Sequence, residues 1–433
     1  MQYIPNIIFL LILVAGSGFF IKNSKKIIRN IQLGYKVDAS DHKKERWNNV
    51  IRIALGQSKM VVRPLAGALH IIVYVGFIII NIEVLEIIID GLFGTHRIFS
   101  SLGSIYGFLI GSFEILAILV LVSVSIFWLR RMVIRIPRFW SKEMTKWPKN
   151  DALYILYFEM VLMSLFLIMN ATDFHFQEMN SGNIISQFLA PMFSGLSEGT
   201  LHIIERSAWW IHIIGIFIFL NYLYYSKHLH ILLAFPNVYY GSVQPKGKFK
   251  NLKSVTNEVK LMMDPNVDPF AAPAEGAEVP AKFGASDVLD LSRTQLLNAY
   301  TCTECGRCTS VCPANQTGKK LSPRKIMMDT RDRLEEVGKN IDANGEFKLD
   351  EKQLLDDYIS REELWACTTC NACVDACPIS IDPLSIIMDM RQYLVMEKSA
   401  APNELNIAMT NIENNGAPWP YNQMDRLNWK DEK

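Results

Sequence analysis

Two cysteine runs with the same spacing lie in the second half of this 433-residue chain. They are Cys302-x-x-Cys305-x-x-Cys308-x-x-x-Cys312-Pro313 and Cys367-x-x-Cys370-x-x-Cys373-x-x-x-Cys377-Pro378. This pattern is typical of the ligands of [4Fe–4S] clusters. The runs use all 8 cysteines, which leaves none for a disulfide or a catalytic thiol and indicates a reducing compartment. A zinc site would need only the CxxC pairs and would leave half of the cysteines unexplained.

The fourth cysteine of such a run binds the cluster of the other run. We therefore predict two clusters with crossed ligands: cluster I at Cys302, Cys305, Cys308 and Cys377, and cluster II at Cys367, Cys370, Cys373 and Cys312. The alternative is two independent four-cysteine sites. Crossed ligation would hold two segments that are distant in sequence together as one electron-transfer unit.

Apolar runs dominate the first 240 residues, and 50% of the whole chain is hydrophobic. Five of these runs are long enough to cross a bilayer of about 30 Å. They are Tyr3–Ile21, Leu65–Ile89, Leu102–Leu129, Leu153–Met169 and Trp209–Leu233. We predict an all-α membrane bundle of five transmembrane helices, followed by a small α-rich dicluster domain of the bacterial ferredoxin type. The formal net charge of +1 argues against a nucleic-acid partner.

The loops between the apolar runs differ in basic charge. The segment from Lys22 to Arg63 carries 11 Lys/Arg and that from Arg130 to Lys149 carries 7, whereas the alternate loops carry one each, Arg97 and Arg206. Because basic loops stay in the cytoplasm, we predict a multi-pass protein of a bacterial-type cytoplasmic membrane. Its N-terminus would lie outside and its cysteines in the cytoplasm. The first run has its basic residues after it, so we expect a retained anchor and not a cleaved signal.

We predict four segments along the chain. They are a transmembrane domain at 1–240, a Pro/Ala-rich linker at 241–283, a cluster domain at 284–400 and a tail at 401–433 that is a candidate partner-docking segment. The linker stretches Pro265–Pro269 and Ala271–Ala281 should run extended.

Within the cluster domain, the turn and capping residues predict three helices. One begins at Ser286 or Asp287 and brings Leu296, Leu297 and Tyr300 beside cluster I. Two more, Pro323–Val337 and Asp350–Leu364, are joined by a turn at Ala343–Gly345.

Four of the 8 histidines lie in or beside the apolar runs: His70, His212, His228 and His230. An imidazole in a membrane is costly and is therefore a functional candidate. His212 and His230 are eighteen residues apart, which in one helix places them on one face and about 27 Å apart. Haem b held between helices would use such residues. The alternative for His228 and His230 is a polar position at the membrane interface.

The segment Tyr225–Pro236 resembles the closing segment of the cytochrome b (gamma) subunit of respiratory nitrate reductase and of the heterodisulfide reductase membrane subunit. The resemblance implies two haems held by two histidines on the second helix and two on the fifth. His70 matches the first position and His212 and His230 match the fifth-helix pair, but Ile80 stands ten residues after His70. We expect one haem b, held by His70 and His230, with His212 and His228 as alternative ligands. A second haem would join His212 to His96, His175 or His202.

The cysteine half resembles the C subunit of heterodisulfide reductase and the iron–sulfur subunits of glycerol-3-phosphate and glycolate oxidases. The matching stretches are Cys302–Pro313, Leu321–Arg324 and Leu364–Pro378. In that family a cysteine-rich domain with CCG motifs usually follows. This chain ends at Lys433 without one, so we expect that domain in a separate subunit, or a different electron acceptor.

Together these features predict a membrane-bound, respiratory-type electron-transfer subunit of an oxidoreductase. It would link quinone, through haem b and two [4Fe–4S] clusters, to a cytoplasmic redox partner. Glu83, Glu86 and Glu114 are candidate proton carriers, and the run Ile184–Phe193 is a candidate cover for a quinone pocket. No glycine fingerprint for nicotinamide or flavin is present, and catalytic residues are not identified. The alternatives are a haem-free anchor for a ferredoxin module, and a component of an electron-transfer-flavoprotein:quinone oxidoreductase with a separate CCG subunit.

Overall fold

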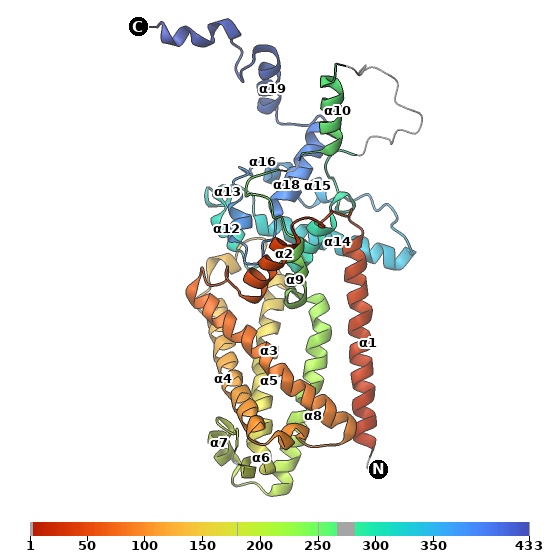
Figure 1. Cartoon of the computed structure of the whole chain (residues 1–433), viewed down its shortest axis with the longest axis vertical. Helices are drawn as coiled ribbons and strands as arrows, with labels where there is room; N and C mark the ends of the chain where they lie inside the picture. The colour runs from red at the N-terminus through yellow and green to blue at the C-terminus, as the bar shows by residue number, and fades with distance from the viewer. Residues whose placement is uncertain (1–2, 180, 250, 266–281, 433) are drawn as a thin grey trace.

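The computed structural model describes residues 3–179, 181–249, 251–265 and 282–432. Within these residues the regular structure consists of helices, with no β-strand. Five long helices form a bundle, and a smaller group of short helices sits on one end of it (Figure 1). The predicted fold class, an all-α membrane bundle with an α-rich dicluster domain, is confirmed.

The long helices are α1 (Ile4–Gln32), α3 (Pro64–Phe93), α4 (Ser104–Met132), α5 (Lys146–Thr172) and α8 (Glu198–Tyr222). Each is long and apolar enough to span a membrane. Proline in the first turn starts α1 and α3, and Gly94 in the left-handed conformation ends α3. Helices α1, α3, α4 and α5 are longer than the predicted runs because flanking residues, such as Lys22–Gln32, continue the same helix.

The bundle packs in the order α3, α4, α5 and α8, with α1 against α3 and α8. Its core includes Phe9, Ile110 and Phe166, which are fully buried. A Cβ at Gly91 would lie 2.6 Å from the ring of Phe9, so the close approach of α1 and α3 requires glycine there. Many apolar side chains on the outward faces are exposed, as in a lipid-facing bundle. The chain is therefore a multi-pass membrane protein.

We name the two ends of the bundle by their position relative to the cysteines. The proximal end carries residues 282–400, which we call the cysteine domain, and the distal end is opposite, beside the N-terminus (Figure 1). The distal end contains η2 (Ile98–Leu102), α6 (Phe174–Met179), α7 (Ser186–Leu189) and η4 (Ala190–Phe193). The run Ile184–Phe193, the candidate cover for a quinone pocket, therefore contains two short helical pieces, α7 and η4.

The fifth helix begins and ends earlier than predicted. It ends at Tyr222 and is followed by η5 (Leu223–Tyr225), η6 (Lys227–Leu229) and α9 (His230–Tyr240). The break occurs because Ser226 is extended (φ −113°, ψ 146°) and its hydroxyl caps the His228 N–H. A continuous helix through Leu233 is wrong, so the 27 Å spacing of His212 and His230 along one helix does not apply.

Further short helices lie at the proximal end. They are α2 (Lys43–Asn49), the π-helix η1 (Val50–Leu55) and η3 (Pro137–Phe139). The predicted linker contains a helix, α10 (Lys253–Met263). The stretch Ala271–Ala281, predicted to be extended, and most of Pro265–Pro269 lie outside the described residues.

The cysteine domain consists of short helices around α14 (Pro323–Asn344). The others are η7 (Val288–Asp290), α11 (Arg293–Thr301), α12 (Arg307–Val311), α13 (Pro313–Gln316), α15 (Leu354–Asp357), α16 (Arg361–Trp365), α17 (Ala372–Ala376), α18 (Pro383–Gln392) and η8 (Tyr393–Glu397). The tail forms α19 (Asn403–Asn415) and η9 (Gln423–Lys430) and extends away from the rest (Figure 1).

Two helix predictions in this domain need correction. Asp287 caps only the short η7, and Ser292 caps the helix α11 that carries Leu296, Leu297 and Tyr300. The predicted single helix Asp350–Leu364 is two short ones, because Ser360 begins a new capping box.

Both basic segments contact the cysteine domain. After α1, Tyr35 exchanges backbone hydrogen bonds with Leu291 (3.1 Å) and Arg293 (2.9 Å). From the other segment, the carbonyl of Arg138 accepts a hydrogen bond of 2.6 Å from Arg324. The basic loops and the cysteines therefore share the proximal end of the bundle.

Candidate metal and redox sites

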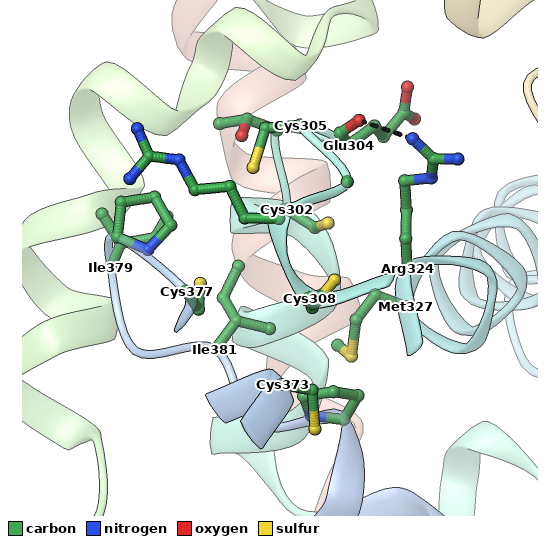
Figure 2. Close-up of a pocket in the computed structure, with 15 residues that line it drawn as sticks. Cys302, Glu304, Cys305, Cys308, Arg324, Met327, Cys373, Cys377, Ile379 and Ile381 are labelled. Atoms are coloured by element: carbon green, nitrogen blue, oxygen red, sulfur yellow. Dashed lines mark hydrogen bonds between the residues drawn. The ribbon is translucent and has the colours of Figure 1, made fainter. Parts of the chain in front are cut away.

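The first cysteine group surrounds a single pocket. Cys302, Cys305, Cys308 and Cys377 line it together, with Cys373 also at its wall (Figure 2). The first three come from the end of α11 and the start of α12, and Cys377 follows α17. The pocket thus contains the four cysteines predicted for cluster I, from both runs.

A left-handed backbone turns the chain around this pocket. Glu304 has φ 55° and Gly306 has φ 70°. A Cβ at Gly306 would lie 2.6 Å from Nη1 of the buried Arg324, so glycine is favoured at this position. The second run repeats the pattern: Thr369 and Asn371, at the equivalent positions, have φ 57° and 62°. The equal spacing of the two runs therefore corresponds to an equal backbone path.

The second cysteine group comprises Cys312, Cys367, Cys370 and Cys373. Cys370 is exposed, whereas Cys312 is buried. Cys312 lies close enough to Cys367 and Cys373 for its charge to raise the pKa of both thiols. The backbone N–H of Thr369 points to Sγ of Cys367 at 3.4 Å, a contact typical of metal-bound thiolates. The last cysteine of each run therefore lies beside the other run.

The ionisation of these thiols is opposed by their burial. Burial raises the pKa of Cys302 and of Cys373 to about 12 and that of Cys377 to about 11. A buried thiolate needs a compensating cation, and iron supplies such a charge. Eight thiols in two groups of four match the ligand requirement of two cubane clusters.

Basic side chains surround the two cysteine groups. Lys59 donates to the carbonyl of Cys377 at 3.2 Å, and Arg307 donates to the carbonyl of Lys59 at 3.0 Å. On the other side, Arg391 donates to the carbonyl of Cys367 at 2.5 Å. Positive charge at these places favours the more reduced, more negative form of a bound cluster.

Glu304, two residues after Cys302, is the centre of a buried ion network. Its carboxylate binds Lys227 and, at 2.7 Å, Arg331. Burial opposes the ionisation of Glu304, but the charges of Lys227 and Arg331 outweigh it and hold its pKa below the usual value. Sequence reasoning missed this residue, because a carboxylate inside a cysteine run has no pattern of its own.

Two histidines meet under the cysteine domain. The ring centroids of His70 in α3 and His230 in α9 are 6.4 Å apart. Nδ1 of His230 lies 3.1 Å from the carbonyl of Lys227, which fixes the ring and leaves Nε2 for another partner. The ring centroids of His228 and His230 are 5.5 Å apart. Nδ1 of His70 has no hydrogen-bond partner within the described chain. The structure thus brings together the two predicted haem ligands.

The remaining histidines lie elsewhere. His212 is buried in α8 beside the ring of Phe166, and Ile80 is buried in α3. His96, at the distal end, lies 3.2 Å from Asp173. His175 and His202 are exposed.

The predicted proton carriers lie in the distal half. Glu114 accepts hydrogen bonds from the backbone N–H groups of Ile185 (2.7 Å) and Ser186 (3.0 Å), so it holds the start of α7 in place. Glu86 accepts from the N–H of Phe99 at 2.8 Å. Glu83 is buried, and its Oε2 has no partner among the described residues.

Arg97 is a distal residue that the sequence did not single out. It is buried and donates to Asp173 (2.7 Å), Asn170 (2.9 Å) and Tyr106 (3.1 Å). Its signal in the sequence was its isolation as the one Lys or Arg residue of the loop between the second and third apolar runs.

Residues 301–381 match the family model of the 4Fe-4S dicluster domain. The chain carries a 4Fe–4S dicluster domain. The predicted binding of [4Fe–4S] clusters is confirmed by this match and by the cysteine motifs, while the ligands of each cluster remain a prediction.

Several known proteins resemble the chain more widely. The probable iron-sulfur-binding oxidoreductase FadF of Bacillus subtilis is 30% identical over 98% of this chain and 61% of its own length. The EtfAB:quinone oxidoreductase of Syntrophomonas wolfei is 24% identical over 99% of this chain and 60% of its own. The C subunit of the ferredoxin/F420H2-dependent CoB-CoM heterodisulfide reductase of Methanosarcina acetivorans is 32% identical over 27% of this chain and 60% of its own.

The chain spans about 60% of the length of the first two relatives. It is a membrane-anchored iron–sulfur protein related to them, and the predicted resemblance to the C subunit of heterodisulfide reductase is confirmed. The resemblance to the nitrate reductase gamma subunit stays a prediction. No solved structure matches the chain.

Proposed function

We propose that this chain is a membrane-bound electron-transfer subunit that connects a redox group inside the helix bundle to two [4Fe–4S] clusters at the proximal end. The observation that carries the proposal is a short chain of contacts. Nδ1 of His230 faces the carbonyl of Lys227, and Lys227 binds Glu304, which is next to Cys305. A hydrogen bond and an ion pair therefore connect the candidate haem ligand His230 to the loop that carries the cysteines of cluster I.

In this proposal the clusters have crossed ligands. Cluster I is held by Cys302, Cys305, Cys308 and Cys377, and cluster II by Cys367, Cys370, Cys373 and Cys312. The common pocket of the first four supports the assignment, because Cys377 reaches it from the other run. Arg307, Lys59 and Arg391 set the positive surroundings of the clusters.

The bundle would hold haem b between His70 and His230. With metal–nitrogen bonds of about 2 Å and about 1.1 Å from each ligating nitrogen to its ring centre, two imidazoles on one iron stand about 6 Å apart. The observed centroid separation of 6.4 Å fits this arrangement. Haem iron supplies one-electron transfer when bound. The carbonyl of Lys227 orients His230, whereas Nδ1 of His70 has no hydrogen-bond partner among the described residues.

Quinone would be the membrane electron carrier in this scheme. The supporting observation is the name of a relative, the EtfAB:quinone oxidoreductase of S. wolfei, whose sequence aligns with 99% of this chain. Protons released or taken up by quinone would pass through buried carboxyl groups such as Glu83 and Glu86. Glu114 has a structural role, since it anchors α7.

The partner would be a cytoplasmic redox protein or domain with CCG motifs, by analogy with the heterodisulfide reductase family. The tail helices α19 and η9 are a candidate docking segment, because they expose Ile407, Ile412 and Trp429 and extend away from the cysteine domain. An electron-transfer flavoprotein is a second candidate donor, favoured by the same S. wolfei relative.

The test is a reduced-minus-oxidised optical spectrum of the purified full chain in detergent, with haem and non-haem iron measured per chain. We expect about one haem b and about eight non-haem iron atoms. Iron without haem would remove the cytochrome proposal and leave the anchor for a ferredoxin module.

A further inference from the structure

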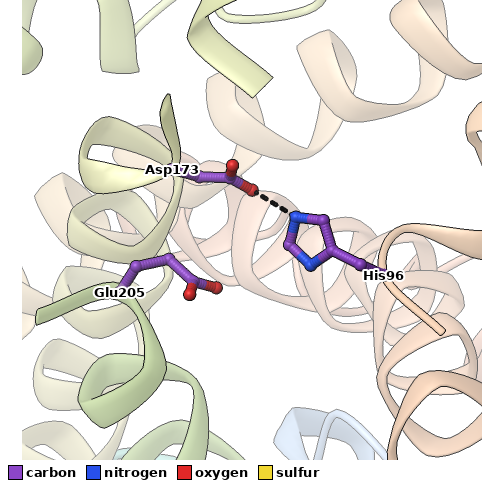
Figure 3. Close-up of side chains that lie close together, drawn as sticks. All are labelled: His96, Asp173 and Glu205. Atoms are coloured by element: carbon purple, nitrogen blue, oxygen red, sulfur yellow. Dashed lines mark ion pairs between the residues drawn. The ribbon is translucent and has the colours of Figure 1, made fainter. Parts of the chain in front are cut away.

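A mixed group of metal-binding side chains lies at the distal end, far from the cysteines. His96 comes from the loop after α3, Asp173 from the end of α5 and Glu205 from α8 (Figure 3). One ligand atom of each lies within 4.8 Å of the other two. Three separate elements therefore point one nitrogen and two carboxylate oxygens toward one place.

A second observation at this place is an unsatisfied carboxylate. Glu83 lines the same pocket as His96 and Glu205, and only 3% of its surface is exposed. Its Oε2 has no hydrogen-bond partner in the described part of the chain. A buried polar atom without a partner is costly, so its presence in a pocket indicates a ligand that the protein atoms do not supply.

The charges around the pocket are unbalanced. Five carboxyl groups lie in or beside it: Glu83, Glu86, Asp90, Asp173 and Glu205. Two guanidinium groups face them, those of Arg97 and Arg206. Additional positive charge is therefore needed if these carboxyl groups are ionised.

We propose that His96, Asp173 and Glu205 bind a divalent transition-metal ion of the zinc class. The imidazole favours zinc over calcium or magnesium, which prefer ligand sets made of oxygen alone. Three protein ligands match a zinc site that keeps one position for water. His96 has 43% of its side chain exposed, so an ion can enter from the distal surface.

Binding would require small rearrangements of existing pairs. The His96–Asp173 contact of 3.2 Å opens to admit the ion, and Arg206, whose side chain is 33% exposed, moves away from Glu205. Arg97 remains on Asp173, in the manner of a partner that orients a ligating carboxylate. The ion would tie the α3–α4 loop, α5 and α8 together at the distal end.

The test is zinc binding by the full chain in detergent with its iron–sulfur clusters loaded, because empty cysteine sites also bind zinc. Equilibrium dialysis with elemental analysis should find one saturable zinc ion per wild-type chain. His96→Ala should lower the affinity by about tenfold or more. Arg206→Ala, which removes a competing cation, should bind zinc at least as tightly as wild type.

His175→Ala is the matched control, because His175 is another exposed histidine at the same end of the bundle. It should leave zinc binding unchanged. Zinc should also raise the unfolding temperature of wild type and of His175→Ala but not that of His96→Ala. Equal zinc affinity of wild type and His96→Ala, or no zinc bound by wild type, would overturn the proposal. Without a bound ion, protonation of some of these carboxyl groups would account for the apparent charge imbalance.

Discussion

Glu304 and Lys227 form a buried ion pair that joins the cysteine domain to the membrane bundle. Glu304 belongs to the first cysteine run, and Lys227 lies in η6, three residues before His230. Arg331 binds the other oxygen of the same carboxylate. The pair therefore fixes the loop of cluster I against the turn that positions a candidate haem ligand, and both groups would move together.

The first prediction is that Glu304→Gln destabilises the interface between the cysteine domain and the bundle. The amide keeps the shape of the side chain but removes the carboxylate that two buried cations share. Asp151 and Asp332 remain as their other acidic partners, so the loss should be at most about 3 kcal/mol. The loss should appear as a lower unfolding temperature and faster release of cluster iron. Asp342→Asn is the control, because its pairs with Lys26 and Arg29 are about one-third exposed and should contribute less than about 1 kcal/mol.

The pH dependence of this effect follows from the lowered pKa of Glu304. Such a carboxylate contributes fully to the free energy of unfolding at a pH above its pKa in the unfolded chain, near 4.5. The contribution is lost as the pH falls through its lower pKa in the folded protein. The loss of stability caused by Glu304→Gln should therefore be the same at about pH 6 and about pH 8. A loss of stability that changes within this window would show that Glu304 titrates there, or that Lys227 does, since burial lowers the pKa of Lys227.

The second prediction concerns the crossed ligands. Cys377→Ala should remove cluster I and therefore give the same electron paramagnetic resonance spectrum and iron loss as Cys302→Ala. Cys312→Ala should resemble Cys370→Ala, because both would affect cluster II. If Cys377→Ala instead resembled Cys370→Ala, each run would hold its own cluster.

The sequence predicted the features that depend on local pattern. Cysteine spacing predicted the dicluster domain, and the length of the apolar runs predicted the five long helices. The charge of the loops predicted that both basic segments lie at the same end of the bundle as the cysteines. The break after Tyr222 was missed, because the apolar residues continue through it and only the extended backbone of Ser226 interrupts the helix. Arg97 and Glu304 were missed for another reason: their roles depend on partners far away in the chain.

The third prediction is that the proximal end faces the cytoplasm. Both basic segments lie at this end, and basic loops are retained on the cytoplasmic side. A protease should therefore cut the segment Ala271–Ala281 in inside-out vesicles and not in right-side-out vesicles. A protease site inserted at the exposed Gly195 of the distal end is the control and should show the opposite pattern. Cleavage of Ala271–Ala281 from the outside would reverse the proposed topology.

The last prediction separates the histidines by their positions. His70 and His230 face each other at a ring separation suited to one iron, whereas His212 lies in a different helix beside Phe166. His70→Ala and His230→Ala should therefore abolish the low-spin haem b spectrum, and His212→Ala should retain it.

His228→Ala tests the neighbouring imidazole, whose ring centroid is 5.5 Å from that of His230, and should also retain the haem. Most of the buried core around the cysteines comes from the cysteine domain itself, so non-haem iron content should stay unchanged in all four variants, which distinguishes haem loss from unfolding. A full haem spectrum in His70→Ala would remove this pair as ligands, and haem loss in His212→Ala would place the haem deeper in the bundle.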